Sequence, residues 1–515
     1  MPQDKRSVRA HDDDYLRAGD QRDPDFKDAP RPPLEPLPPL RLAGLLLGPL
    51  LAIVILISPA PEGMTPEAWR MTAITVWMVV WWLSEAVPIP ATALLPLAVM
   101  PLLGVQDMSA TAGRYGHPLI FLFLGGFLLA AGMQRVGLHR RIALQIVTAV
   151  GTTPSRIVLG FMLATAFLSM WISNTATTIM MYAVGLSVID FVATKTADRT
   201  MVRNFGVALM LAIAYSASIG GVGTLIGTPP NALLASFLQS NYEIEISFSG
   251  WMLLGVPIVV IMLPLTWLLL TRFLFPAHRI AIDDPKGVVE KELSELGAMS
   301  RGEKLVGVVF LCAALLWIFR QPVSGFTGLP LNDTMIAISA ALVLFSIPIS
   351  RAKSEFALDW EAARNVPWGV LILFGGGLAL AGGFSTTGLA EWIGNAVTGV
   401  QISTMLLVLV VTIAIVYLTE ITSNTASTAT FLPILGAVAV GLSLHPATMT
   451  VPVALGASMA FMMPVATPPN AIVFSFEEMK LADMVRAGFL LNILAIAVAF
   501  SLFVTLGPLI FGFEL

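Results

Sequence analysis

The chain has 515 residues, of which 56% are hydrophobic and 12% charged, and its mean hydropathy is +0.82. About a quarter of the residues of a typical soluble domain are charged, so this composition excludes an ordinary water-soluble enzyme or binding module. The net charge of −4 does not indicate what kind of molecule the protein binds, because the charged residues are unevenly distributed along the chain. Apolar runs of about 20 residues, long enough to cross a bilayer as helix, recur from Leu42 onward. We expect a polytopic membrane protein.

The first 41 residues differ from the rest of the chain. They hold eight Lys/Arg and nine Asp/Glu among many prolines, without an apolar stripe of helical or strand period. We expect residues 1–41 to be a disordered, charged tail. Its acidic run 11–14 could be interpreted as a metal site, but a solvated tail explains it more simply. No cleavable signal peptide is expected, since the first apolar run begins only near residue 42.

A polar linker divides the apolar remainder into two halves. Residues 276–304 form the most charged internal stretch and are too polar to lie in lipid. The predicted organisation is a tail at 1–41, a first helix and first repeat half at 42–275, the linker at 276–304 and a second repeat half at 305–515. The predicted spans lie at 42–57, 68–83, 91–103, 119–133, 156–190, 204–239, 250–275, 305–319, 333–349, 367–383, 403–418, 424–443, 449–476 and 485–513. We expect an all-α protein with about 11 transmembrane helices plus two shorter, re-entrant helical hairpins.

The two halves share three sequence elements in the same order. Helix packing in membranes requires small residues rather than polar strings, so these matches indicate a duplication. Transporters built from two repeats place their substrate where broken helices of both repeats meet. The paired elements are the glycine-rich segments 123–126 and 374–377, Ser-Asn-Thr-Ala at 173–176 and 423–426, and Thr-Pro-Pro-Asn-Ala at 228–232 and 467–471.

Each Ser-Asn-Thr lies within an otherwise apolar run. These side chains compete for backbone hydrogen bonds and favour local unwinding of a helix, which membranes tolerate only where the backbone lines a cavity or is buried. The break would offer hydroxyl and amide donors, backbone N–H groups that suit a carboxylate, and oxygens that suit a hard cation. The consecutive prolines at 229–230 and 468–469 disfavour helix as well and free backbone carbonyls.

Neither motif neighbourhood contains Lys or Arg. An anion would therefore be held by neutral donors, dipoles and nearby cations, because bringing a divalent anion alone into a low-dielectric site costs too much free energy. Binding of the anion would depend on binding of the cation. Glu420, beside the second motif, is expected to support the structure through a hydrogen bond, and proton coupling is the alternative.

At these residues the sequence resembles the divalent anion:sodium symporter family, whose members carry dicarboxylates, citrate or sulfate. The resemblance covers roughly residues 42–515 and includes Trp-Leu-Ser-Glu-Ala-Val-Pro at 82–88. It implies two inverted repeats, a homodimer, and an elevator-type transport domain that moves against a scaffold domain.

The resemblance also implies site residues by position, with Na⁺ as the coupling ion. The first sodium site would consist of Ser169, Ser173, Asn174 and Gly227. The second would consist of Thr419, Thr422, Asn424 and Ala466, with backbone carbonyls contributing to both. The substrate-binding residues would be Ser173, Asn174, Thr175, Thr228, Ser423, Asn424, Thr425, Thr467 and Pro468.

The leading hypothesis is sodium-coupled symport of a C4-dicarboxylate such as succinate, malate or fumarate. A sodium-independent dicarboxylate exchanger, a sulfate symporter and a non-transporting membrane sensor remain as alternatives. Symport is favoured over exchange because none of the cation-site positions has a cationic side chain. We expect no enzyme, since no nucleophile with a base or metal cluster occurs, and no nucleic-acid partner. Basic residues of the tail and of the segment 135–141 favour a cytoplasmic N-terminus, in a protein of the cell (inner) membrane.

Overall fold

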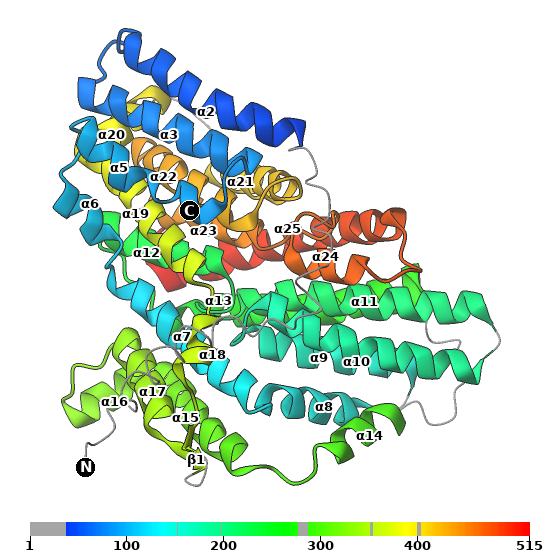
Figure 1. The fold of residues 1–515 in the computed structure, drawn as a ribbon. Coiled ribbons are helices and arrows are strands. Elements are labelled where there is room, and N and C mark those ends of the chain that lie inside the picture. Colours follow the sequence, from blue (N-terminus) through cyan, green and yellow to red (C-terminus); the bar gives the residue numbers. More distant parts are fainter. Residues whose placement is uncertain are drawn as a thin grey trace, which may run out of the picture.

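The computed structural model describes residues 38–151, 153–196, 198–276, 287–350, 354–398 and 403–514, and is almost entirely helical (Figure 1). Nearly all of the predicted tail, including its acidic run, lies outside the described residues, as does part of the linker. The elements of the first half are α2 (Pro39–Ile57), α3 (Pro66–Ser84), α4 (Ile89–Thr92), α5 (Leu95–Leu102), α6 (Met108–Arg114), α7 (Pro118–Arg135), α8 (Leu138–Val150), α9 (Pro154–Ser169), α10 (Asn174–Lys195), α11 (Arg199–Val222), α12 (Pro229–Tyr242), α13 (Phe248–Leu268) and the π-helical turn η2 (Leu269–Leu274).

The second half repeats this helical character and adds one small hairpin. Strands β1 and β2 pair antiparallel, with Pro348 opposite Phe356. The elements are α14 (Gly287–Glu295), α15 (Arg301–Ile318), α16 (Arg320–Thr327), α17 (Asp333–Ser346), β1 (Pro348–Ser350), β2 (Glu355–Phe356), α18 (Trp360–Arg364), α19 (Trp368–Thr387), α20 (Leu389–Val397), α21 (Thr404–Thr419), α22 (Asn424–Gly441), α23 (Ala447–Ala457), α24 (Pro468–Phe474) and α25 (Leu481–Phe511).

Local signals in the sequence set many of the helix starts. Thr65, Asp107 and Ser247 each accept a hydrogen bond from the backbone N–H three residues later, which satisfies one of the donors that a helix leaves free. Proline occupies a first-turn position of α3, α7, α9, α12 and α24, where its missing N–H costs nothing.

In the described part of the chain, eight helices are long and apolar enough to cross a membrane, or nine if the bent pair α15 and α16 is one span. Five further apolar helices have 10–17 residues. The protein is therefore a multi-pass membrane protein, and the number of about 11 crossings stays a prediction. Three predicted spans, 156–190, 204–239 and 449–476, were drawn too long, because each is interrupted where a polar motif interrupts the apolar run.

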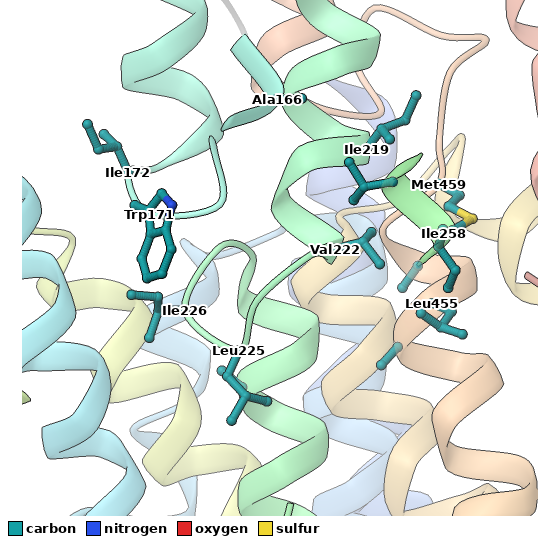
Figure 2. Close-up of a cluster of buried hydrophobic side chains, with 14 of the residues drawn as sticks. Ala166, Trp171, Ile172, Ile219, Val222, Leu225, Ile226, Ile258, Leu455 and Met459 are labelled. Atoms are coloured by element: carbon teal, nitrogen blue, oxygen red, sulfur yellow. The ribbon is translucent and has the colours of Figure 1, made fainter. Parts of the chain in front are cut away.

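These interruptions are shielded from lipid by apolar side chains. Figure 2 shows Trp171 of the first break next to Ile226, which lies between α11 and α12, with Ile172 on the other side of Trp171 and Leu225 further along the same turn as Ile226. All four side chains are buried, as is Val222 at the end of α11. Non-helical backbone at membrane depth requires such enclosure, because lipid supplies no hydrogen-bond partners.

The glycine-rich segments pack in matching ways in the two halves. A Cβ added at Gly125 of α7 would meet Ala337 of α17, and one at Gly376 of α19 would meet Ala93, directly after α4. Both glycines thus allow two helical segments to approach closely, as small residues do in membrane proteins. The matched packing supports the interpretation that the halves arose by duplication.

Helices of the two halves also interlock across the centre of the molecule. Helix α10 of the first half packs against α24 of the second, and α12 of the first half packs against α22 of the second. Around this centre, α8, α9, α10 and α11 run side by side, whereas α15 and α17 form a separate group (Figure 1). The motifs of both halves are thereby brought to one region.

The described end of the linker contains a helix that its polar composition did not predict. Helix α14 packs on α8, and the Arg140 side chain donates to Glu292 at 3.2 Å. Beside it, buried Arg141 pairs with buried Glu303 (Nε to Oε1, 2.5 Å) and donates to the carbonyl oxygens of Leu296 and Gly297. Two carboxylates of this segment, Glu292 and Glu303, thus pair with arginines of α8, whereas Glu290, Lys291 and Glu295 are exposed.

We predict that Gly376→Ala lowers the stability by about 1–3 kcal/mol, since the added methyl group would overpack against the backbone of Ala93. Gly377→Ala is the matched control, because its added Cβ would make only ordinary contacts, the nearest at 3.5 Å with Leu233. Thermal unfolding of both variants in detergent measures the difference. Equal unfolding midpoints would contradict the packing at Gly376.

Candidate functional site

The two Ser-Asn-Thr motifs lie at helix interruptions, as predicted. Helix α9 ends at Ser169 and α10 begins at Asn174, while α21 ends at Thr419 and α22 begins at Asn424. Ser173 caps α10 by accepting a hydrogen bond from the backbone N–H of Ala176 at 3.3 Å. Each motif therefore combines hydroxyl and amide side chains with a helix N-terminus, whose free N–H groups favour an anion.

Four oxygen-bearing groups gather at the first motif. The Ser169 hydroxyl contacts the Asn174 side-chain amide and donates to the carbonyl oxygen of Ala217 at 2.7 Å. The side-chain oxygen of Asn174 faces the carbonyl oxygens of Ala217 and Gly227. If the amide oxygen and nitrogen were interchanged, the nitrogen would donate to these carbonyls at 3.1 Å and 3.3 Å. One hydroxyl, two carbonyls and an amide oxygen are neutral hard ligands, and this group fits Na⁺.

The second motif repeats this arrangement. The Thr419 hydroxyl donates to Asn424 Oδ1 at 2.8 Å and lies 3.4 Å from the carbonyl oxygen of Ala457. Ala466 corresponds to Gly227 and occupies the same place in the following turn. Thr422 hydrogen-bonds instead to the carbonyl oxygen of Leu418 at 3.0 Å and to Ser427 at 2.6 Å, so its role as a sodium ligand stays a prediction.

The asparagine of each Pro-Pro-Asn holds the neighbouring turn in place. Asn231 Nδ2 lies 2.8 Å from the carbonyl oxygen of Thr224 and 3.2 Å from that of Gly221. Asn470 Nδ2 lies 3.0 Å from the carbonyl oxygen of Met463 and bonds to a second carbonyl at 3.3 Å. Both asparagines are fully buried. Their amides satisfy carbonyls that the helix break leaves free.

A single cavity of about 460 Å³ lies between the motifs. Among the described residues that line it, there is no Lys, Arg, Asp or Glu. All nine predicted substrate residues line it, together with Gly227 and Ala466, whereas Ser169 and Thr419 are buried behind its wall. Pro229, Pro230 and Pro469 of the same motifs also line it. The lining residues that the sequence motifs did not indicate are Phe127, Ile226, Asn365, Pro367 and Val370.

Glu420 anchors the turn that precedes the second Pro-Pro-Asn. Its buried carboxylate accepts hydrogen bonds from the backbone N–H groups of Phe461, Met462 and Met463 at 2.8–3.0 Å. It also accepts one from Asn492 Nδ2 at 2.7 Å. The expected hydrogen bonds of this side chain are present, with four donors around its two oxygens, and the alternative role in proton coupling stays a prediction.

In the first repeat the corresponding connection has donor and acceptor exchanged: the side chain belongs to the turn and donates to the backbone at the helix end. Met170 stands where the second repeat has Glu420, and Thr224 stands where it has Met463. The Thr224 hydroxyl donates to the Met170 carbonyl oxygen at 2.5 Å. The first turn is thus tied to the end of α9 and the second to the end of α21, and only the second tie is made by an ionisable side chain.

A polytopic helical bundle in which two sets of broken helices meet around one cavity is typical of secondary transporters. A sequence profile described as "Sodium:sulfate symporter transmembrane region" matches residues 41–512. The chain belongs to the sodium:sulfate symporter family, which confirms the resemblance found in its sequence.

Individual relatives are similar over nearly their whole length. The sodium-dependent dicarboxylate transporter SdcS of Staphylococcus saprophyticus is 43% identical over 482 residues, which are 92% of this chain and 93% of the relative. SdcS of Staphylococcus aureus is 40% identical over 483 residues, with the same shares. Among solved structures, the YdaH transporter of Alcanivorax borkumensis, described as having an unusual topology, covers 85% of this chain and 98% of its own at 16% identity, with a TM-score of 0.57. The YdaH likeness shows a similar fold alone.

We predict that Glu420→Gln destabilises the protein, because the substitution replaces one acceptor oxygen with a donor that faces backbone N–H groups. Each buried donor left without a partner costs about 1–3 kcal/mol. Glu391→Gln, an exposed position in the first turn of α20, is the matched control. Thermal unfolding midpoints should fall for Glu420→Gln and stay unchanged for Glu391→Gln; equal midpoints would refute the anchoring role of Glu420.

Proposed function

We propose that this protein is a secondary active transporter that moves a C4-dicarboxylate, such as succinate, malate or fumarate, together with Na⁺ by symport. The observation that carries the proposal is the cavity between the two motifs, with neutral donors on its wall and a group of oxygen ligands behind each motif. The names of the SdcS relatives support the same substrate and the same coupling ion.

The arrangement suits an anion that carries a carboxylate at each end. Ser173 to Thr175 of the first motif and Ser423 to Thr425 of the second all line the cavity. Each carboxylate would accept hydrogen bonds from the side chains of one motif and from the N–H groups at the start of α10 or α22. The volume of about 460 Å³ lies within the range of small-molecule sites. The prolines and Val370 would contact the carbon chain.

Coupling follows from the shared residues and from charge. Asn174 and Asn424 each line the cavity and also belong to an oxygen group that fits Na⁺. A dianion entering this low-dielectric cavity meets no fixed positive charge, so bound Na⁺ would lower the cost of its desolvation. Na⁺ also selects the side-chain orientation in which each asparagine presents its nitrogen to the substrate. Substrate affinity therefore depends on Na⁺.

The larger architecture belongs to the same proposal. We infer two inverted repeats, about 11 spans and re-entrant hairpins formed by α9 with α10 and by α21 with α22. Because α10 packs with α24 and α12 with α22, these helices would move as one unit in an elevator-type motion. The protein would be a homodimer in the cell (inner) membrane. The basic residues at 135–141 would mark the cytoplasmic side, on which the N-terminus also lies.

Flux through the purified protein in liposomes tests this function. We predict that labelled succinate accumulates when a sodium gradient is directed inward and does not accumulate when choline replaces sodium. Uptake that is indifferent to sodium but requires internal succinate would instead identify an exchanger. Unlabelled sulfate that inhibits succinate uptake would identify sulfate as a competing substrate. Binding of succinate without flux would identify a sensor.

We predict that Asn174→Ala lowers the apparent sodium affinity about 10- to 100-fold, because the variant loses one polar group of a buried ligand set worth about 1–3 kcal/mol. Succinate uptake should fall with it. Asn241→Ala is the matched control, since Asn241 is also partly buried but lies at the end of α12 and does not line the cavity. Its side chain donates to Phe237 within its own helix and accepts a hydrogen bond from Ser385 at 3.4 Å. The sodium dependence of succinate uptake is measured for both variants. If the two variants have the same apparent sodium affinity, the sodium site does not lie at Asn174.

A further inference from the structure

A second cavity adjoins the one between the motifs. It has a volume of about 380 Å³ and shares Phe127, Ser173, Asn365 and Pro367 with the first cavity. Gln134, which lines the outer cavity alone, is exposed, as are Asn365 and Pro367, which line both cavities. The outer cavity therefore extends from Ser173 of the first motif to the exposed end of α7.

Arg135 is the one basic residue among the described residues that line either cavity. It is the last residue of α7, eight positions after Phe127, which is about 12 Å along a helix axis. Its side chain is 26% exposed and pairs with the carboxylate of Asp359. The outer cavity thus holds the fixed positive charge that the inner cavity lacks.

Asp359 has two functions that can be separated. Its Oδ1 accepts a hydrogen bond from the backbone N–H of Ala362 at 2.9 Å and so caps α18, while its Oδ2 pairs with Arg135. The Arg135 guanidinium, followed by the Ala362 N–H, holds the pKa of this carboxyl below its usual value. Asp359 is therefore charged at neutral pH and neutralises Arg135 in this conformation.

A dicarboxylate in the outer cavity competes with Asp359 for the same guanidinium. Arginine binds carboxylates in a planar, two-pronged geometry, whichever molecule carries them. The pair is 39% exposed on its Asp359 side, so an incoming carboxylate can approach without displacing buried groups. An unopposed arginine would retain the dianion, whereas an outer cavity without Arg135 would offer a carboxylate no ion-pair partner.

We propose that Arg135 receives the dicarboxylate between solution and the motifs by exchanging Asp359 for a substrate carboxylate, and that Asp359 then reclaims Arg135 and releases the substrate. This inference rests on the proposed transport function. Arg135 raises the rate at which the anion is captured, and Asp359 prevents the captured anion from staying bound. No covalent bond changes; one ion pair replaces another.

Opposite effects of the two substitutions test the exchange. In inside-out vesicles, whose outer face is the cytoplasmic side that carries Arg135, Arg135→Gln raises the KM of sodium-driven succinate uptake about tenfold. It also reverses the dependence of KM on ionic strength, because Asp359 is left unopposed and repels the dianion. Asp359→Asn retains the helix cap, since asparagine caps as well as aspartate, and frees Arg135. It lowers both KM and the maximal rate, as substrate leaves more slowly. Arg135→Lys keeps the charge and gives an intermediate KM.

Arg140→Gln is the matched control. It removes the same charge five residues away, where Arg140 is 46% exposed, pairs with Glu292 and lines neither cavity. Its KM and salt dependence stay those of the wild type. The inference is overturned if Arg135→Gln matches Arg140→Gln while both transport succinate with sodium. It is also overturned if Arg135→Gln and Asp359→Asn shift KM in the same direction. That result is expected if the ion pair only holds α7 and α18 together, because either substitution breaks the pair. Absence of sodium-driven uptake in the wild type overturns the proposed function itself.

Discussion

Backbone groups without helical partners, held at membrane depth, are the constraint on which the rest of this structure depends. Every carbonyl and N–H in the turns around the motifs needs a partner, because lipid offers none. Asn231 and Asn470 satisfy carbonyls, and Glu420 satisfies three N–H groups. The carbonyl oxygens of Ala217 and Gly227 face the Asn174 side chain instead, and these are the oxygens that we propose as ligands of Na⁺.

The sequence predicted the positions of these breaks because the residues that cause them are short-range signals. Ser, Asn and Thr within an apolar run, and paired prolines, act on their own backbone, and their recurrence in the second half marked them as related. The nine substrate residues predicted by resemblance lie on one cavity for the same reason. Their binding roles stay predictions until transport is measured.

Other parts of the site left no local signal. Ala217 and Ala457 contribute carbonyl oxygens, and a backbone oxygen is independent of residue type. Phe127 and Asn365 come from segments outside the motifs, and only tertiary packing brings them to the cavity. Arg135 was interpreted from sequence as a marker of membrane orientation, since its partner Asp359 is 224 positions away. The spans drawn through 204–239 and 449–476 were too long because hydropathy averages over a break.

The interlocking of α10 with α24 and of α12 with α22 bears on how the chain is made. Helix α24 begins at residue 468, almost 300 residues after the start of α10. At a synthesis rate of about 5–20 residues per second, the first motif waits on the order of 15–60 s for its packing partner. During that interval the polar residues of the first motif lack the contacts that α24 later supplies. Biogenesis of this protein therefore passes through an intermediate in which these residues need another partner, such as lipid headgroups, water or a chaperone.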